Sequence, residues 1–253
     1  MRHYGQLFII ATLATALLGC TPKEQILKIE GGNIKVVASE KQEGAAKVRD
    51  ILASASMAVD SIRRPVIGYA AHDLEKRIPE SPLMNFAADA LLATAREHTG
   101  EHIDIAITNK GGLRSNMQAG TITFGDIYNV FPFENTLALL TLDGTQLLQL
   151  CREIAAVGGE AVSGIQLVIT PQRELVNATV GGKPIEPSGR YRIATSDYLA
   201  QGNDRMSSLA SGTERDIKSD VTIRDLMVKY IKGLAAKGME LDAECDGRIT
   251  VKD

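Results

Sequence analysis

Residues 81–114, SPLMNFAADALLATAREHTGEHIDIAITNKGGLR, carry the signals of a helix, a buried strand and a glycine-bearing turn in succession. Ser81 is a favoured N-cap residue, Pro82 fits the first helical position, and Gly100 suits the position where a helix ends. The face expected to pack inward consists of Leu83, Phe86, Ala87, Ala90, Leu91 and Thr94. The apolar run at 103–108 then predicts a strand. A helix followed by a buried strand is typical of proteins that pack helices on sheets.

The turn after this strand, ITNKGGLRSNM at 107–117, has two interpretations. Gly111 and Gly112 supply the positive φ angles that tight turns need, and an arginine is usually solvated. Alternatively, the glycines let backbone N–H groups approach a ligand, while Arg114 offers a planar fork of donors to an anion or a ribose. This stretch alone favours the turn, because Gly-rich polar clusters are usually loops.

Helical and strand patterns alternate along the rest of the chain. Helices are predicted at 43–62, from Asp143 or Thr145 onward, and at 221–237. Strands are predicted within 26–40 (two, joined at Gly31-Gly32), and at 65–71, 120–124, 136–142, 164–170, 174–185 (a hairpin), 191–196 and 248–251. This alternation predicts an α/β fold in which a mixed sheet has helices on both faces. Because no repeat, long linker or low-complexity block interrupts it, residues 41–253 are expected to form one domain.

The N-terminus has the pattern of a bacterial export signal. A basic residue, Arg2, precedes an apolar stretch from Leu7 to Leu18 that is short for a membrane span. The sequence Leu-Leu-Gly-Cys that ends at Cys20 resembles a lipobox, whose cysteine becomes the lipid-modified first residue. An ordinary signal peptide or a short anchor is the alternative. We therefore expect a lipoprotein signal peptide at 1–19, a tether with the leading strands at 20–40, and a lipid-anchored protein of the cell envelope, periplasmic or on the cell surface.

The charge balance is acidic. Removal of the predicted signal takes Arg2 from the 28 basic residues and leaves 31 acidic ones, so the mature chain has a formal charge of −4. Proteins that bind nucleic acids generally carry a basic surface instead. We therefore expect no nucleic-acid partner, and an anionic ligand would depend on local arginines.

Two cysteines follow Cys20. Cys151 lies in an apolar helical pattern, which predicts a buried thiol, whereas Cys245 lies near the C-terminus. In an exported protein a disulfide between the two is the alternative. The chain contains no CxxC pair and no cluster of cysteine with histidine that would suggest a metal site.

Four stretches together resemble one family. They are NFAADALL at 85–92, the long block TNKGGLRSNMQAGTITFGDIYNVFPFENTLALLTLDGTQLL at 108–148, VSGIQLVI at 162–169 and YRIATSDYLAQGNDRM at 191–206. In this order they resemble the C-terminal domain of the 5′-nucleotidase and UDP-sugar hydrolase family, from about residue 65 to residue 251. The resemblance implies a nucleotide-recognition domain. In the family, an N-terminal metallophosphatase domain supplies two metal ions and the catalytic groups, and a hinge motion brings the substrate to them.

The resemblance also implies ligand contacts. Two aromatic rings of the family sandwich the base, and the matching residues here are Phe133 and Tyr198. Such a slot suits a nucleobase because stacking accepts any π-face and contributes about 1–3 kcal/mol per base. Asp204 matches the acid that accepts hydrogen bonds from the ribose hydroxyls.

Five further residues fall on ligand-contact positions of the family. Arg114 matches the arginine that reaches sugar and phosphate, and Asn109 matches an asparagine near base and sugar. Asn135 and Gly164 match other contact positions, and Arg77 matches a second basic position before the helix. The turn at 107–117 is accordingly expected to hold a ligand.

The chain departs from the family pattern at three places. Lys110 replaces a glycine of the usual NGGGxR, Asp73 stands where some members carry an arginine, and GNDRM replaces GGDGY at residues 202–206. Lys110 and Arg205 are expected to add positive charge near the ligand, whereas Asp73 would repel a phosphate if it points inward. Substrate choice is the property that these departures affect.

The motifs of a catalytic metal site are missing from the sequence. A dinuclear centre takes several histidine and carboxylate ligands, yet the chain has four histidines and no HExxH motif. His98 and His102 are four residues apart, but Gly100 between them breaks the helix. We therefore expect no catalytic residue, metal or cofactor in this chain, and divalent metals only on a partner metallophosphatase domain.

Together, these observations predict a nucleotide- or nucleoside-binding domain that acts with a separate metallophosphatase chain in the hydrolysis of extracellular nucleotides. Such a chain would be nearly inactive alone. The alternatives are a structural or interaction lipoprotein that keeps the fold without the ligand, and a hydrolase that needs no partner.

Overall fold

The computed structural model describes residues 45–252 of the 253-residue chain. The predicted signal peptide, Cys20 and the leading strands within 26–40 lie outside the described residues. Residues 50–253 form one compact unit, and of the other unit, residues 1–49, the description covers the first turn of a helix. No helix of the described range is long and apolar enough to cross a membrane.

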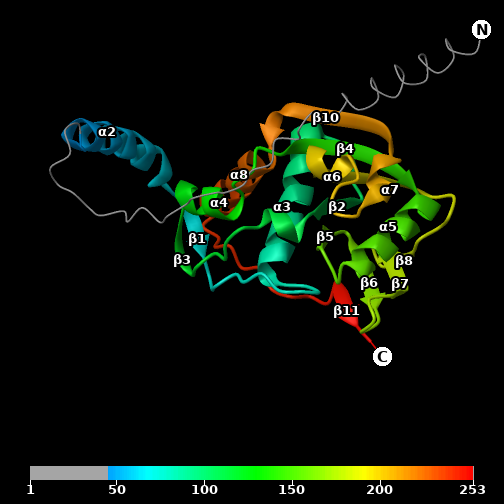
Figure 1. Cartoon of the computed structure of the whole chain (residues 1–253). Coiled ribbons are helices and arrows are strands. Elements are labelled where there is room, and N and C mark those ends of the chain that lie inside the picture. Colours follow the sequence, from blue (N-terminus) through cyan, green and yellow to red (C-terminus); the bar gives the residue numbers. More distant parts are fainter. Residues whose placement is uncertain (1–44, 253) are drawn as a thin grey trace, which may run out of the picture. The chain divides into compact units, whose positions relative to one another are not determined.

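The central element is a five-stranded mixed sheet in the order β10-β4-β9-β2-β5 (Figure 1). Its strands are β10 (Thr213–Thr222), β4 (Thr136–Asp143), β9 (Arg190–Ser196), β2 (Ile105–Thr108) and β5 (Ala161–Ser163). The pair β2 and β9 is parallel, whereas the other neighbours are antiparallel. Because β2 and β9 are parallel, the chain between them must cross over, and this stretch contains α5 (Gly144–Ala156).

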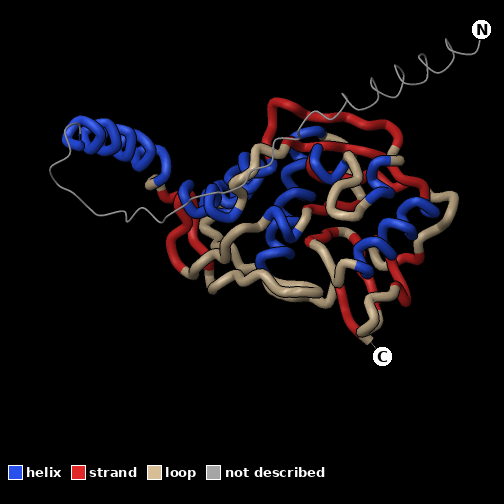
Figure 2. Tube along the Cα trace, viewed as in Figure 1, coloured by secondary structure: helices blue, strands red, loops and turns tan. Residues whose placement is uncertain are grey.

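Alternating side chains give this sheet a buried core on each face. In β4, Leu137 and Leu139 point into one core, while Leu140 and Leu142 point into the other. The first core is closed by α3 (Pro82–Thr99) and α8 (Ile223–Ala236), and the second by α5 (Gly144–Ala156). Helices therefore cover both faces, as the sequence predicts, and Figure 2 shows them on the two sides of the strands.

The described residues form three sheets rather than the single predicted one. A four-stranded sheet contains β11 (Ile249–Val251), β6 (Ile165–Ile169), β7 (Leu175–Val180) and β8 (Lys183–Pro184), in this order. A two-stranded sheet pairs β1 (Val66–Ala70) with β3 (Gly120–Thr123). The chain passes from the central sheet to the four-stranded sheet at Gly164, whose φ of 80° separates β5 from β6.

Local signals placed most elements correctly. The side chain of Ser81 accepts from the Met84 amide at the start of α3, and Gly100 ends this helix with a φ of 69°. Asp143 caps α5 and forms a capping box with Gln146. Six elements were not predicted: β5, β10, α4 (Phe124–Val130) and the three short helices η1 (Lys110–Gly112), α6 (Asp197–Ala200) and α7 (Ser207–Ala210). The sequence of α4 does contain a signal, because Thr123 and Asp126 form a capping box.

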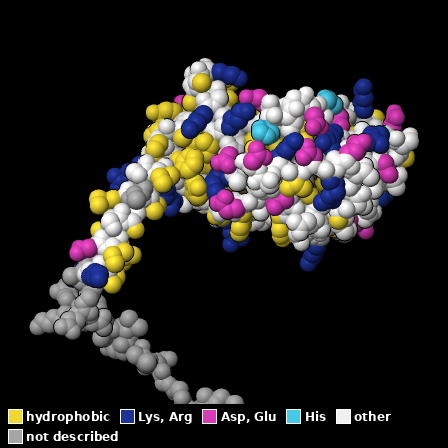
Figure 3. All heavy atoms as spheres, turned by 90° about the horizontal axis from the view of Figure 1, so that it is seen from above, with side chains coloured by type: hydrophobic (Ala, Val, Ile, Leu, Met, Phe, Trp, Pro, Cys, Tyr) yellow, Lys and Arg dark blue, Asp and Glu magenta, His cyan; other side chains and the backbone are white. Residues whose placement is uncertain are grey.

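The helix α2 (Ala45–Arg63) exposes an apolar stripe. Ile51, Leu52, Val59 and Ile62 lie on one side of the helix, and each is at least 49% exposed. Figure 3 shows apolar side chains along this helix. An apolar stripe on a surface helix normally faces other parts of a protein, so this surface is a candidate for contact with another polypeptide segment.

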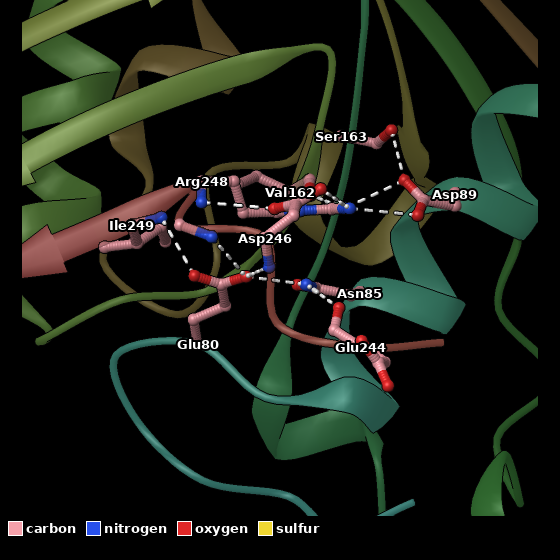
Figure 4. Close-up of polar contacts among 10 residues, drawn as sticks. Glu80, Asn85, Asp89, Val162, Ser163, Glu244, Asp246, Arg248 and Ile249 are labelled. Atoms are coloured by element: carbon pink, nitrogen blue, oxygen red, sulfur yellow. Dashed lines mark hydrogen bonds and ion pairs between the residues drawn. The ribbon is translucent and has the colours of Figure 1, made fainter. Parts of the chain in front are cut away.

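The C-terminal segment is fixed to α3 by a polar network (Figure 4). The Glu80 carboxylate accepts from the Asn85 side chain and from the backbone amides of Asp246 and Ile249. Arg248, which is 9% exposed, donates to both carboxylate oxygens of Asp89 and to the Val162 carbonyl. Because these groups are satisfied from both sides, the segment before β11 has a defined position against the helix.

Cys151 and Cys245 are both free thiols, so the disulfide alternative is wrong. Cys151 is fully buried in α5, as predicted, and burial raises the pKa of its thiol to about 12. A thiol with such a pKa is protonated and unreactive at neutral pH, so Cys151 acts as a core residue.

Candidate functional site

One cavity collects six of the eight predicted ligand contacts. It has a volume of about 360 Å³. Its lining consists of Asn109, Gly111, Arg114, Phe133, Asn135, Tyr198 and Asp204. The cavity lies beside the loops that follow β2 and β9 and precede β4.

The sheet topology explains why distant segments meet there. The strands β2 and β9 are parallel neighbours, so their carboxyl ends, which lead to Asn109 and Tyr198, lie at one edge of the sheet. The strand β4 is antiparallel to β9 and pairs Leu137 with Ser196, so its amino end, preceded by Asn135, reaches the same edge. Ligand sites of α/β proteins commonly form at such an edge.

Asp204 is the polar centre of the cavity. One of its carboxylate oxygens accepts a hydrogen bond of 2.6 Å from Asn109 Nδ2, and the other accepts one of 2.9 Å from the Tyr198 hydroxyl. Asp204 and Arg205 both have positive φ angles, 54° and 66°. Two consecutive non-glycine residues in this region are uncommon, and such strain concentrates at functional sites. The carboxylate therefore faces the cavity in a fixed orientation.

The two predicted stacking rings line this same cavity. Phe133 is 49% exposed and Tyr198 is 37% exposed. A large apolar ring that is half exposed beside a cavity gains stability when a flat ligand covers it. Tyr198 is held by its hydrogen bond to Asp204, which also raises the pKa of its phenol. The ring is therefore oriented before any ligand binds.

Arg114 lies at the rim of the cavity with its guanidinium available. Its backbone amide donates to the Val130 carbonyl, which fixes the loop, whereas its side chain makes one long hydrogen bond, 3.4 Å, to the Gly111 carbonyl. Among residues 45–252, Arg114 has no carboxylate partner. A guanidinium without an acidic partner beside a cavity is suited to bind an anionic group.

Lys110 does not add charge to the cavity, so that expectation was wrong. Its ammonium group forms an ion pair of 2.7 Å with Glu160 and donates to the Val157 and Gly159 carbonyls. Glu160, which is 4% exposed, also accepts from the Lys110 backbone amide. Burial raises the pKa of Glu160, while the ion pair with Lys110 opposes this shift. The pair fixes the loop and lies outside the cavity lining.

Asp73 also lies outside the cavity lining. Its carboxylate accepts a hydrogen bond of 2.7 Å from the Ala119 backbone amide. Asp73 does not point into the cavity lining, so the condition under which it would repel a phosphate is not met. The third departure, at 202–206, retains Asp204 in the lining but places no side chain of Arg205 there.

Two predicted contacts, Arg77 and Gly164, lie outside the lining of this cavity. Arg77 is an exposed residue 3.8 Å from Glu75. Gly164 lines a different hollow with Asp89 and Arg248. A side chain at position 164 would collide with the Asp104 carbonyl, so packing alone requires a glycine there.

Gly111 lines the cavity, in agreement with the interpretation of the turn as a ligand-binding loop. One feature of the site was not predicted from the sequence: Glu160 supports the loop from outside the lining. The sequence signal for Glu160 is an acid followed directly by the apolar strand AVS of β5, a context in which an acid needs a partner. Lys110, the departure from the family pattern, is that partner.

Comparisons with known proteins identify the family of the chain. A family model described as "5'-nucleotidase, C-terminal domain" matches residues 66–211. The trifunctional nucleotide phosphoesterase protein YfkN of Bacillus subtilis is 28% identical over 245 residues, 88% of this chain and 16% of that protein. A probable 5′-nucleotidase of Treponema pallidum is 23% identical over 247 residues, 89% of this chain and 40% of that protein. This chain therefore spans less than half the length of these relatives.

Solved structures show the same fold. The crystal structure of a 5′-nucleotidase precursor from Thermus thermophilus aligns with a TM-score of 0.70 at 24% identity, over 82% of this chain and 43% of that one. Because the family model covers more than half of the sequence, from β1 to the loop before β10, the chain belongs to the 5′-nucleotidase C-terminal domain family.

Proposed function

We propose that this protein binds nucleotides or nucleosides in the cavity between Phe133 and Tyr198. The supporting observation is the convergence of two half-exposed rings, one carboxylate and one unpaired guanidinium in a single cavity. Rings suit a base, a carboxylate suits the paired hydroxyls of a ribose, and a guanidinium suits a phosphate. The nucleotide-related function of the family agrees with this assignment.

A shift in melting temperature tests this proposal. We expect adenosine, AMP or UDP-glucose to stabilise the purified protein, because a ligand that binds the folded state alone raises its stability. Ribose 5-phosphate is the control that lacks a base, and it should stabilise the protein less. If none of the base-containing compounds changes the melting temperature at millimolar concentration, the alternative of a structural lipoprotein is favoured.

The ribose contact makes a separate prediction. Asp204→Asn is expected to weaken adenosine binding by about 1.5–3 kcal/mol, the contribution of hydrogen bonds to a charged group. Asparagine is the suitable replacement because it tolerates the positive φ of Asp204. The affinity for free adenine, which has no ribose, should change little. Calorimetry with both ligands separates the outcomes, and an equal loss for adenine and adenosine would contradict the ribose assignment.

We further propose that hydrolysis requires a second, metallophosphatase chain. Within residues 45–252, one group of three or more His, Cys, Asp or Glu side chains is arranged closely enough for a metal ion, and it lies away from the cavity. A two-metal hydrolase site needs more ligands than three. The apolar stripe of α2 offers a surface that the partner would cover.

Enzyme assays address the partner. The purified chain should release no phosphate from AMP with added Mg²⁺, Mn²⁺, Co²⁺ or Zn²⁺. A complex co-purified from the native host should release phosphate, and replacing Ile51 and Leu52 together with lysine should abolish this association. Phosphate release by the chain alone would refute the need for a partner.

We also infer that Cys20 carries the lipid anchor and that residues 1–19 are removed. The support is the lipobox-like ending at Cys20. Mass spectrometry of the native N-terminus tests this. A diacylated Cys20 is expected, and an unmodified Cys20 would contradict the anchor.

A further inference from the structure

Three side chains of residue types that commonly ligate metals lie close together outside the lining of the cavity described above, although they are far apart in the sequence. His72 follows β1, while Asp242 and Glu244 belong to the segment between α8 and β11. One ligand atom from each lies within 4.8 Å of the others. We propose that His72, Asp242 and Glu244 bind a divalent transition metal, with Zn²⁺ as the best match to one imidazole and two carboxylates.

The hydrogen bond on the far side of the imidazole ring fixes its tautomer. His72 Nδ1 lies 3.0 Å from the Asp73 carbonyl, which can only accept a hydrogen bond. In the neutral ring Nδ1 therefore carries the proton, and Nε2 presents its lone pair toward the carboxylates. This is the arrangement of most zinc-bound histidines, whose second nitrogen donates to a carbonyl or a carboxylate.

The contact between His72 and Asp242 has the spacing of two ligands of one cation. His72 Nε2 is 3.2 Å from Asp242 Oδ1, an ion-pair distance. Nevertheless the Nε2 atom is buried and has no hydrogen bond of acceptable direction within the described part of the chain. Two ligands about 2.0–2.1 Å from a tetrahedral zinc ion are about 3.3 Å apart, close to the observed separation.

The backbone holds the three ligands in place. The Leu241 carbonyl accepts from the Ala71 amide at 3.0 Å, and the Leu241 amide donates to the Tyr69 carbonyl at 2.7 Å. These bonds place Asp242 beside His72. Two residues further on, the Glu244 carbonyl accepts a hydrogen bond of 2.8 Å from the Asn85 side chain, which Figure 4 shows. A site on such fixed segments binds a metal without first ordering its ligands.

The charges at this site also favour a cation. The Asp73 carbonyl and Asp242 raise the pKa of His72, but above that pKa the imidazole is neutral and two carboxylates face each other without a compensating positive charge among the three groups. Zn²⁺ would neutralise both and take water as its fourth ligand. The ion would then tie the loop after β1 to the C-terminal segment, a structural role independent of the nucleotide cavity.

Calorimetric titration of EDTA-treated protein with ZnSO₄ tests this site. We expect one equivalent to bind and to raise the melting temperature. His72→Ala should weaken the binding at least about 100-fold, since even outer partners of metal ligands change affinity about 10–100-fold. The paired substitutions Asp242→Asn and Glu244→Gln should have the same effect, because they remove both anionic ligands but keep their size.

A second histidine provides the matched control. His102 lies 3.0 Å from Asp104, also as a histidine–carboxylate pair, but no third ligand is grouped with it. His102→Ala should therefore leave zinc binding unchanged, and Cys245→Ser should do the same, which excludes the exposed thiol. Absence of stoichiometric zinc binding, or binding that survives His72→Ala, would show that His72 and Asp242 form an ion pair only.

Discussion

Replacing Phe133 and Tyr198 together with alanine is expected to lower the affinity for adenosine at least about 30-fold. Each ring contributes about 1–3 kcal/mol by stacking on the base, so the two contribute about 2–6 kcal/mol. Both rings are substantially exposed, so the folded state loses little packing when they are removed. Equilibrium dialysis with labelled adenosine measures the affinity, and thermal unfolding checks that the double variant remains folded.

Two variants make this result specific. Tyr69→Ala removes an aromatic ring of similar exposure that does not line the cavity, and it should leave the affinity unchanged. Tyr198→Phe keeps the ring but removes the hydroxyl that donates to Asp204, so it should retain most of the stacking energy. A double variant that binds adenosine as tightly as the wild type would show that no base stacks between the rings.

Lys110→Met is expected to destabilise the protein by about 3 kcal/mol at neutral pH without a direct effect on the ligand. The substitution leaves the Glu160 carboxylate, 4% exposed, without its ion-pair partner, and breaking a buried pair costs about 3–5 kcal/mol. We expect the lower end of this energy range because the Lys110 side chain is 25% exposed, so the pair is only partly buried. Urea unfolding of both proteins gives the difference in the free energy of unfolding.

The pH dependence of this loss follows from the direction of the Glu160 shift. Burial already raises the pKa of Glu160, and removal of Lys110 takes away the ion pair that opposes the rise. An acid whose pKa is higher in the folded than in the unfolded state stabilises the fold at low pH, and this contribution disappears as the pH rises through the folded pKa. The variant should therefore approach wild-type stability as the pH is lowered.

A second substitution completes the test. Lys110→Met combined with Glu160→Leu removes both charges, so it should recover part of the lost stability at neutral pH. If Lys110→Met leaves the stability unchanged but weakens AMP binding, Lys110 acts on the ligand rather than on Glu160.

The fold was predictable where local signals are strong. Ser81 and Gly100 mark the two ends of α3, and Asp143 marks the start of α5. β10 was missed because TERDIKSDVT is polar on both sides, as befits an edge strand that is exposed along most of its length. The division into three sheets depends on strand pairing between distant segments, which no local pattern encodes.

The site was predictable only through the resemblance. Phe133 and Tyr198 are separated in the sequence by β4, α5 and the strands β5 to β9, and composition gives no reason to place them together. Lys110 shows the limit of assigning roles to single residues from the family pattern. It occupies a position expected to face the ligand, but its ammonium group forms an ion pair with Glu160. The group of His72, Asp242 and Glu244 was invisible in the sequence because about 170 residues separate its members, far beyond any metal-motif spacing.

Calorimetric titration of the wild-type protein with adenosine tests the central claim most directly. The claim is that the cavity at the edge of the central sheet accommodates a nucleobase with its ribose. We expect saturable binding of one adenosine per chain, with a weaker signal for ribose 5-phosphate. An absence of saturable binding by adenosine, AMP and UDP-glucose up to millimolar concentration would contradict it.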